Sequence, residues 1–114
     1  MNTADTILVI GACGQIGSEL TMALRKIYSN VIAADLKEPG NEVRDSGLFI
    51  RLDVLNKPSL YETVKKYNIT QIYHLAAILS ATGEKNPELA WRVNMKGLRQ
   101  VLDACIELGV KKLF

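Results

Sequence analysis

The chain has 114 residues, a formal net charge of +2 and 48% apolar residues, which is the balance of one ordinary soluble globular domain. This net charge is too small to indicate a nucleic-acid partner, and the Lys and Arg residues are scattered rather than striped. No apolar run approaches the roughly 18 residues of a membrane span, and the N-terminus lacks a secretion signal. Cys13 and Cys105 show neither metal-ligand spacing nor a disulfide framework. We therefore expect a cytoplasmic protein with two free thiols.

Short runs rich in apolar and β-branched residues predict the strands. Runs of this kind are typical of strands that are buried on both faces of a sheet. The second run is followed directly by an acid, Asp35, and the third has an acid, Asp53, near its end. The predicted strands cover residues 6–10, 31–34, 48–54, 71–75 and 110–114.

Amphipathic segments between these strands predict helices. One follows the first strand, one begins at Asn56-Lys57-Pro58, and one covers residues 89–108 before a capping Gly109. Residues 38–41 are typical of a turn. The predicted apolar faces comprise Ile16, Leu20, Ala23, Leu24 and Ile27 in the first helix; Leu60, Val64 and Tyr67 in the second; and Val93, Leu98, Val101, Leu102 and Cys105 in the third.

The alternation of strands and helices predicts a doubly wound α/β fold. Parallel strands need crossover connections, and helices in those connections cover both faces of the sheet. The last predicted strand coincides with the end of the chain, and a complete fold of this kind has more strands. We therefore expect residues 1–114 to be the N-terminal part of a single domain whose sheet is incomplete on its C-terminal side.

Three glycines, Gly11, Gly14 and Gly17, stand at the junction between the first strand and the first helix. In a dinucleotide site, such glycines allow a sharp turn, close approach of the pyrophosphate, and close packing of helix on strand. The helix N-terminus then offers N–H groups to the phosphates. The pattern alone is equally compatible with a turn that binds nothing. Its position after a buried strand, with an acid following in the sequence, favours dinucleotide binding.

That acid is Asp35, which lies 18 residues after Gly17 at the end of the second strand. A carboxylate there accepts hydrogen bonds from the ribose hydroxyls of NAD and repels the 2′-phosphate of NADP. Lys37 partly offsets this repulsion, and a solvated strand-end acid is the alternative interpretation of Asp35. Asp53 is compatible with a contact to the adenine amino group or, nearly equally, with a turn-forming acid. The pattern predicts NAD rather than NADP.

Several motifs together resemble the extended short-chain dehydrogenase/reductase superfamily, which includes NAD-dependent nucleotide-sugar epimerases and dehydratases. They are GACGQIG, Asp35, Asp53-Val54, the segment 74–77 (HLAA) and Asn94-x-x-Gly97. The segment HLAAILSATGEKNPELAWRVNMKGL, together with GQIG, resembles the short-chain type of L-threonine 3-dehydrogenase. The resemblance implies a Rossmann fold, bound NAD, a protein roughly three times as long and a homodimer when the protein is complete.

The resemblance also implies a role for individual residues. Ser80 and Thr82 correspond to substrate-side loop residues, although both are equally compatible with plain polar loop positions. Asn94 corresponds to a helix asparagine that holds the active-site framework or the cofactor. The implied cofactor contacts are Gly11, Gly14, Gln15, Ile16 and Gly17 at the pyrophosphate, Asp35 at the ribose, Asp53 and Val54 at the adenine, and Leu75, Ala76 and Ala77 beneath the cofactor.

The resemblance places the catalytic Ser or Thr and a Y-x-x-x-K pair after the fifth strand, beyond Phe114. Tyr61 and Lys65 match that spacing, but they lie on a crossover helix, so we interpret the match as coincidental. His74 is predicted to be a packed residue rather than a base. The implied reaction is oxidation of L-threonine by NAD to 2-amino-3-oxobutyrate. The alternatives are a nucleotide-sugar epimerase or dehydratase, and a non-catalytic NAD-binding module.

Overall fold

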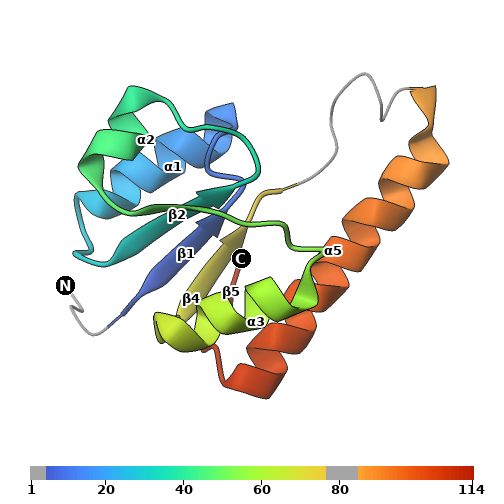
Figure 1. Ribbon diagram of the computed structural model, residues 1–114. Coiled ribbons are helices and arrows are strands. Elements are labelled where there is room, and N and C mark those ends of the chain that lie inside the picture. Colours follow the sequence, from blue (N-terminus) through green and yellow to red (C-terminus); the bar gives the residue numbers. More distant parts are fainter. Residues whose placement is uncertain (1–4, 77–84) are drawn as a thin grey trace.

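Within the residues that the computed structural model describes, 5–76 and 85–114, five parallel strands form one sheet in the order β3-β2-β1-β4-β5 (Figure 1). Helices cover both faces, so the predicted doubly wound fold is confirmed. The elements are β1 (Ile7–Ile10), α1 (Gln15–Arg25), β2 (Val31–Asp35), α2 (Asn41–Ser46), β3 (Phe49–Arg51), α3 (Lys57–Lys66), β4 (Gln71–His74), α5 (Pro87–Leu108) and β5 (Lys112–Leu113).

The central strand β1 is buried on both faces, as its unbroken apolar sequence predicts. Ile7 and Val9 face the layer formed by α1 and α2. Leu8 and Ile10 face the layer formed by α3 and α5. All four side chains are at most 1% exposed. Successive side chains of a strand point to opposite faces, so one short strand contributes to two separate hydrophobic cores.

The chain changes direction in the sheet on either side of β1. The strand β2 pairs with one edge of β1, and β4 pairs with the other. In an open α/β sheet, such a reversal of strand order leaves a crevice at the carboxyl ends of the strands, where ligands bind. The glycine-rich turn and the strand-end acids both lie at that edge.

Two apolar faces were predicted too broadly. Ile16 is 73% exposed because it lies in the first turn of α1, and Ile27 is 53% exposed because α1 ends before it, at Arg25. In α5, Val101 and Cys105 face the sheet, whereas Leu102 is 42% exposed. Adjacent helical residues point about 100° apart, so Leu102 turns away when Val101 is buried.

Some element boundaries also differ from the prediction. The third strand ends at Arg51 rather than residue 54, since a turn stabilised by Asp53 begins there. The last strand covers two residues rather than five. The predicted turn at 38–41 leads into a helix, α2, whose buried residue is Val43.

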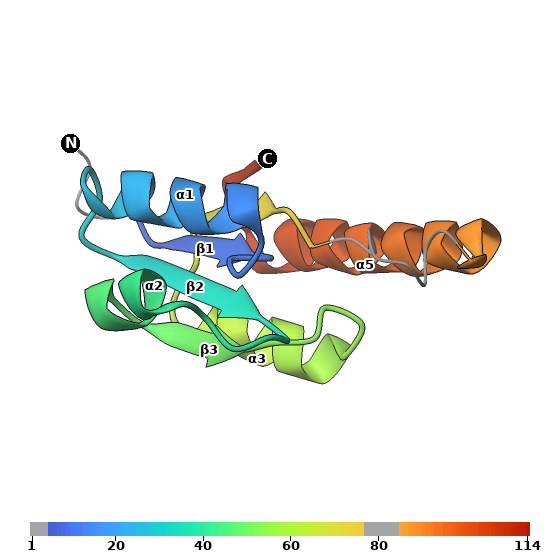
Figure 2. The same ribbon diagram turned by 90° about the horizontal axis from the view of Figure 1, so that it is seen from above.

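The longest helix, α5, has 22 residues and extends past the carboxyl edge of the sheet (Figures 1 and 2). Gly109 ends it in a left-handed conformation, as predicted. None of the helices within residues 5–76 and 85–114 is both long enough and apolar enough to cross a membrane. Both cysteines are free thiols.

Candidate functional site

The glycine-rich turn after β1 is tightly packed at its first glycine. Gly11 has a φ of +90°, which strongly favours glycine, and its N–H donates to the carbonyl of Ala34 at 2.9 Å. A Cβ atom on Gly11 would lie 2.7 Å from the nitrogen of Ala76. The turn therefore brings the ends of β1, β2 and β4 together.

The other two glycines face different surroundings. A Cβ atom on Gly17 would lie 2.0 Å from the carbonyl oxygen of Gly11, so α1 packs directly on the turn. A Cβ atom on Gly14 would have only that same oxygen nearby, at 3.6 Å, so this side of Gly14 is open. Gly17 is required by the fold, whereas Gly14 leaves room for a group from outside.

The N-terminus of α1 is suited to an anion. Gly14 is its N-cap, and among the described residues no side chain caps it and no acid lies in its first turn. Gln15 and Ile16 are exposed there. The first N–H groups of a helix have no partner within the helix and carry a partial positive charge. This open glycine cradle fits a pyrophosphate.

Asp35 ends β2 beside this cradle, and two main-chain groups hold its carboxylate. Its Oδ2 accepts from the N–H of Cys13 at 2.9 Å, and its Oδ1 accepts from the N–H of Lys37 at 3.1 Å. The Cys13 thiol donates to the Lys37 carbonyl at 3.2 Å. The glycine turn and the segment after β2 are thus joined through three contacts.

The Cys13 thiol is not activated. Burial, followed by the charge of Asp35, raises its pKa to about 11. A nucleophilic cysteine needs a lowered pKa, since the thiolate is the reactive form. Cys13 therefore contributes hydrogen bonds to this region rather than nucleophilic chemistry.

The segment after β3 lies next to Asp35, because Leu52 N–H donates to the Asp35 carbonyl at 3.1 Å. Asp53 Oδ1 accepts from the N–H of Leu55 at 2.9 Å, which is the turn-forming role that the sequence left open. The helix α5 supports the segment: Gln100 Nε2 donates to the Val54 carbonyl at 2.9 Å, and a Cβ atom on Gly97 would lie 3.1 Å from Val54 Cγ2.

The remaining predicted site residues lie after β4 and in α5. Leu75 and Ala76 directly follow β4, and Leu75 N–H donates to the Ile10 carbonyl at 2.8 Å. Asn94 is half-buried in α5, one turn before Gly97. Ala77, Ser80 and Thr82 lie outside the described residues.

His74, the last residue of β4, is partly buried, and burial lowers its pKa. Its Nδ1 is buried and has no hydrogen-bond partner among residues 5–76 and 85–114. Burial therefore favours the neutral ring, which agrees with the prediction of a packed residue.

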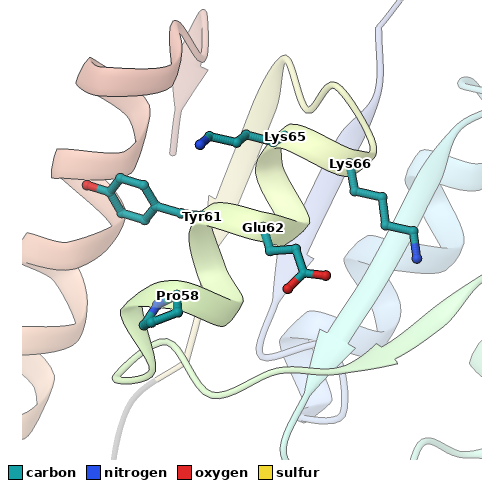
Figure 3. Close-up of a pocket in the computed structure, with 5 residues that line it drawn as sticks. All are labelled: Pro58, Tyr61, Glu62, Lys65 and Lys66. Atoms are coloured by element: carbon teal, nitrogen blue, oxygen red, sulfur yellow. The ribbon is translucent and has the colours of Figure 1, made fainter.

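Tyr61 and Lys65 do not form a catalytic pair. They line a surface hollow on α3, with Pro58, Glu62 and Lys66 (Figure 3). Tyr61 points to α5, and its hydroxyl donates to Glu107, which is the main cause that raises its pKa to about 12. A catalytic tyrosine base needs the opposite shift. Tyr61 and Lys65 therefore match the Y-x-x-x-K spacing by chance, and the hydrogen bond of Tyr61 has a structural role.

Two supporting contacts, one by Gln100 and one by Cys13, were not predicted from the sequence. Gln100 is one turn after Gly97 on the same face of α5, and that spacing is a signal that a helix contacts the neighbouring segment. The contacts of Cys13 were not visible in the sequence: its main-chain N–H donates to Asp35 across 22 residues and its thiol donates to the Lys37 carbonyl across 24, separations that no local pattern reveals.

Comparison with known proteins gives the family. Residues 7–114 match the model of the NAD dependent epimerase/dehydratase family. The chain belongs to this family. NAD, the cofactor predicted from Asp35 and the glycines, is the cofactor of the family. An uncharacterized epimerase/dehydratase of Staphylococcus aureus (strain USA300) is 45% identical over 101 residues, which are 86% of this chain and 32% of that protein.

Several solved structures have the same arrangement. A partial consensus L-threonine 3-dehydrogenase is 46% identical with a TM-score of 0.86, over 96% of this chain and 35% of that one. The GalE-like L-threonine dehydrogenase of Cupriavidus necator, in its holo form, is 42% identical with a TM-score of 0.86, over 96% and 35%. The UDP-glucose 4-epimerase of Brucella ovis, in complex with NAD, is 28% identical with a TM-score of 0.83, over 96% and 34%. The chain spans about a third of the length of these relatives.

Proposed function

We propose that residues 1–114 are the N-terminal, NAD-binding part of an NAD-dependent L-threonine 3-dehydrogenase. The observation that carries the NAD assignment is the open cradle at Gly14, beside the carboxylate of Asp35 at the carboxyl edge of the sheet. The substrate assignment is supported by identity: threonine dehydrogenases reach 46%, whereas the UDP-glucose 4-epimerase of Brucella ovis reaches 28%.

Each predicted contact has a defined role in this proposal. The N–H groups at the start of α1 bind the pyrophosphate, and Gly14 lets it approach. Asp35 accepts hydrogen bonds from the adenosine ribose. Asp53 and Val54 lie beside the adenine, where Gln100 and Gly97 support Val54. The proposed cofactor contacts are Gly11, Gly14, Gln15, Ile16, Gly17, Asp35, Asp53, Val54, Leu75, Ala76, Ala77 and Asn94.

The chain's own part in the reaction is to bind and orient the cofactor. NAD supplies the hydride acceptor for oxidation of the threonine β-hydroxyl, giving 2-amino-3-oxobutyrate. Ser80 and Thr82 are proposed substrate-side residues. The proton-transferring tyrosine and its lysine are expected beyond Phe114, so residues 1–114 alone are predicted to bind without turnover. A cytoplasmic location and a homodimer of the complete protein remain predictions.

The substrate proposal is tested on the protein expressed with all of its open reading frame. With L-threonine and NAD, we expect NADH to form as L-threonine is oxidised to 2-amino-3-oxobutyrate, a β-keto acid that then loses CO2 to give aminoacetone. UDP-glucose and UDP-galactose serve as the comparison, because an epimerase would interconvert them without net NADH formation. Epimerisation without threonine oxidation would contradict the substrate assignment and retain the NAD assignment. NAD binding without either reaction would favour the non-catalytic module.

A further inference from the structure

An arginine lies next to the proposed ribose site. Arg51 ends β3, and in the parallel register it is the partner of Asp35 in β2. Partners in neighbouring strands are about 4.8 Å apart and point to the same face of the sheet. Arg51 Nη1 donates to the carbonyl of Leu36 at 2.9 Å, so the guanidinium bends over the segment that follows Asp35.

One acid, Glu38, forms an ion pair with this arginine. Glu38 accepts from Arg51 Nη2 through Oε1. Its Oε2 forms a longer ion pair with Arg44 at 3.5 Å, and Arg44 also donates to the Pro39 carbonyl at 3.2 Å. Glu38 therefore stands between two arginines at the same edge of the sheet as Asp35.

These charged groups are accessible to a ligand. The side chains of Arg51 and Glu38 are 60% and 70% exposed, and that of Arg44 is 51% exposed. Exposed ion pairs contribute little net stability, so exchanging Glu38 for another anion costs the fold little. An arginine binds a phosphate as readily as a carboxylate, through paired N–H donors.

NADP differs from NAD by a phosphate on the ribose that Asp35 is proposed to bind. Beside this ribose, a 2′-phosphate would meet the charge of Asp35, and also two arginines that are already paired with Glu38. Without Glu38, the same two arginines and Lys37 would form a positively charged edge suited to that phosphate.

We propose that Glu38 is a specificity-determining residue that favours NAD over NADP by occupying Arg51 and Arg44. The inference rests on the proposed NAD site. It adds a second determinant to Asp35: Asp35 repels the 2′-phosphate, and Glu38 withholds the cations that would attract it.

The test measures the Kd of NAD and of NADP for the protein expressed with its whole open reading frame, by calorimetry at low ionic strength. Glu38→Gln is expected to lower the ratio of the NADP Kd to the NAD Kd by about fivefold, the scale of an exposed charge interaction, and added salt should shrink this change. The matched control is Glu42→Gln. It removes the same charge from exposed α2, where Glu42 forms no ion pair with the described residues.

A further variant identifies the groups that cause the change. Replacing Arg44 and Arg51 with Gln in the Glu38→Gln protein should restore the original ratio. Equal Kd ratios for Glu38→Gln and Glu42→Gln would overturn the inference. A gain in relative NADP affinity that persists after both arginines are replaced would overturn it too. Neither result would contradict the proposed NAD site. Failure of the unmodified protein to bind NAD would instead refute the proposed function, and this inference with it. Thermal unfolding checks that every variant is folded.

Discussion

At the residue scale, Gly14 is proposed to serve cofactor binding, whereas Gly17 is required by the fold. Gly17→Ala places a methyl group 2.0 Å from the Gly11 carbonyl oxygen, so we expect a loss of more than about 2 kcal/mol of stability. Gly14→Ala meets no close protein atom, and its φ of −73° suits alanine. We expect it to cost about 1 kcal/mol or less, as an N-cap change, but to weaken NAD binding strongly.

Urea unfolding and NAD calorimetry on the two variants test this difference. The two glycines serve as controls for each other, since both substitutions add one methyl group within the same turn. Equal losses of stability in the two variants, or full NAD affinity in Gly14→Ala, would contradict the assignment of Gly14 to the pyrophosphate.

Cys13 gives a pH-dependent prediction at the same scale. Burial and Asp35 raise its pKa to about 11, from an ordinary value of 9.0, so the thiolate is scarcer in the folded protein. Near pH 8 we expect iodoacetamide to alkylate Cys13 about a hundredfold more slowly than in urea-unfolded protein. The folded rate should rise tenfold per pH unit up to about pH 11, as followed by mass spectrometry. A plateau at or below pH 9 would show that the thiol is not held protonated.

At the element scale, one arginine holds four elements together. Arg25, at the end of α1, donates through Nη1 to the Val43 carbonyl at 2.7 Å, and through Nη2 to the carbonyls of Val31 at 3.0 Å and Leu48 at 2.7 Å. A Cβ atom on Gly47 would lie 2.7 Å from Arg25 Cζ, so the guanidinium packs on this glycine. The ends of α1 and α2 are thereby fixed to β2 and to the start of β3.

We expect Arg25→Met to cost about 2–4 kcal/mol, because it leaves the partly buried carbonyls of Val31 and Val43 without their charged donor. Lys26→Met is the matched control: Lys26 is the exposed next residue, and a surface change of this kind costs within about 0.5 kcal/mol. Denaturant unfolding measures both values. Similar effects from the two substitutions would mean that Arg25 is an ordinary surface residue.

The sequence predicts the elements that depend on local interactions, and it does not predict those that depend on residues distant in the chain. The apolar run Ile7–Ile10 predicts β1 and its burial because the strand is covered on both faces. The helix α2 has six residues with Val43 as its buried residue, so it lacks a helical periodicity. It depends on Arg25, which is 18 residues from Val43 in the sequence. Contacts of this range are not visible in a local pattern.

The candidate site follows the same rule. Glycine spacing and the strand-end position of Asp35 predict the cradle and its acid, since both are local to a strand end. The sequence left two interpretations of Asp53 open, an adenine contact and a turn-forming acid. The hydrogen bond from the Leu55 N–H shows that the turn forms. The link from Gln100 to the Val54 carbonyl joins residues that are 46 apart, so it needed the folded chain.

At the scale of the whole molecule, the fold brings four separate segments to one edge of the sheet. The ends of β1, β2 and β4 meet at Gly11, and the segment after β3 joins Asp35 through Leu52. A dinucleotide needs this combination, because its pyrophosphate, ribose and adenine must be bound at once. We therefore expect this edge to be an NAD site that is selective against NADP.

The decisive measurement is calorimetric titration of the protein, expressed with its whole open reading frame, first with NAD and then with NADP. We predict one saturable NAD site per chain and an NADP affinity weaker by about tenfold or more, the scale of a charge-assisted contact replaced by repulsion. Absence of NAD binding, or NADP binding as tight as that of NAD, would contradict it.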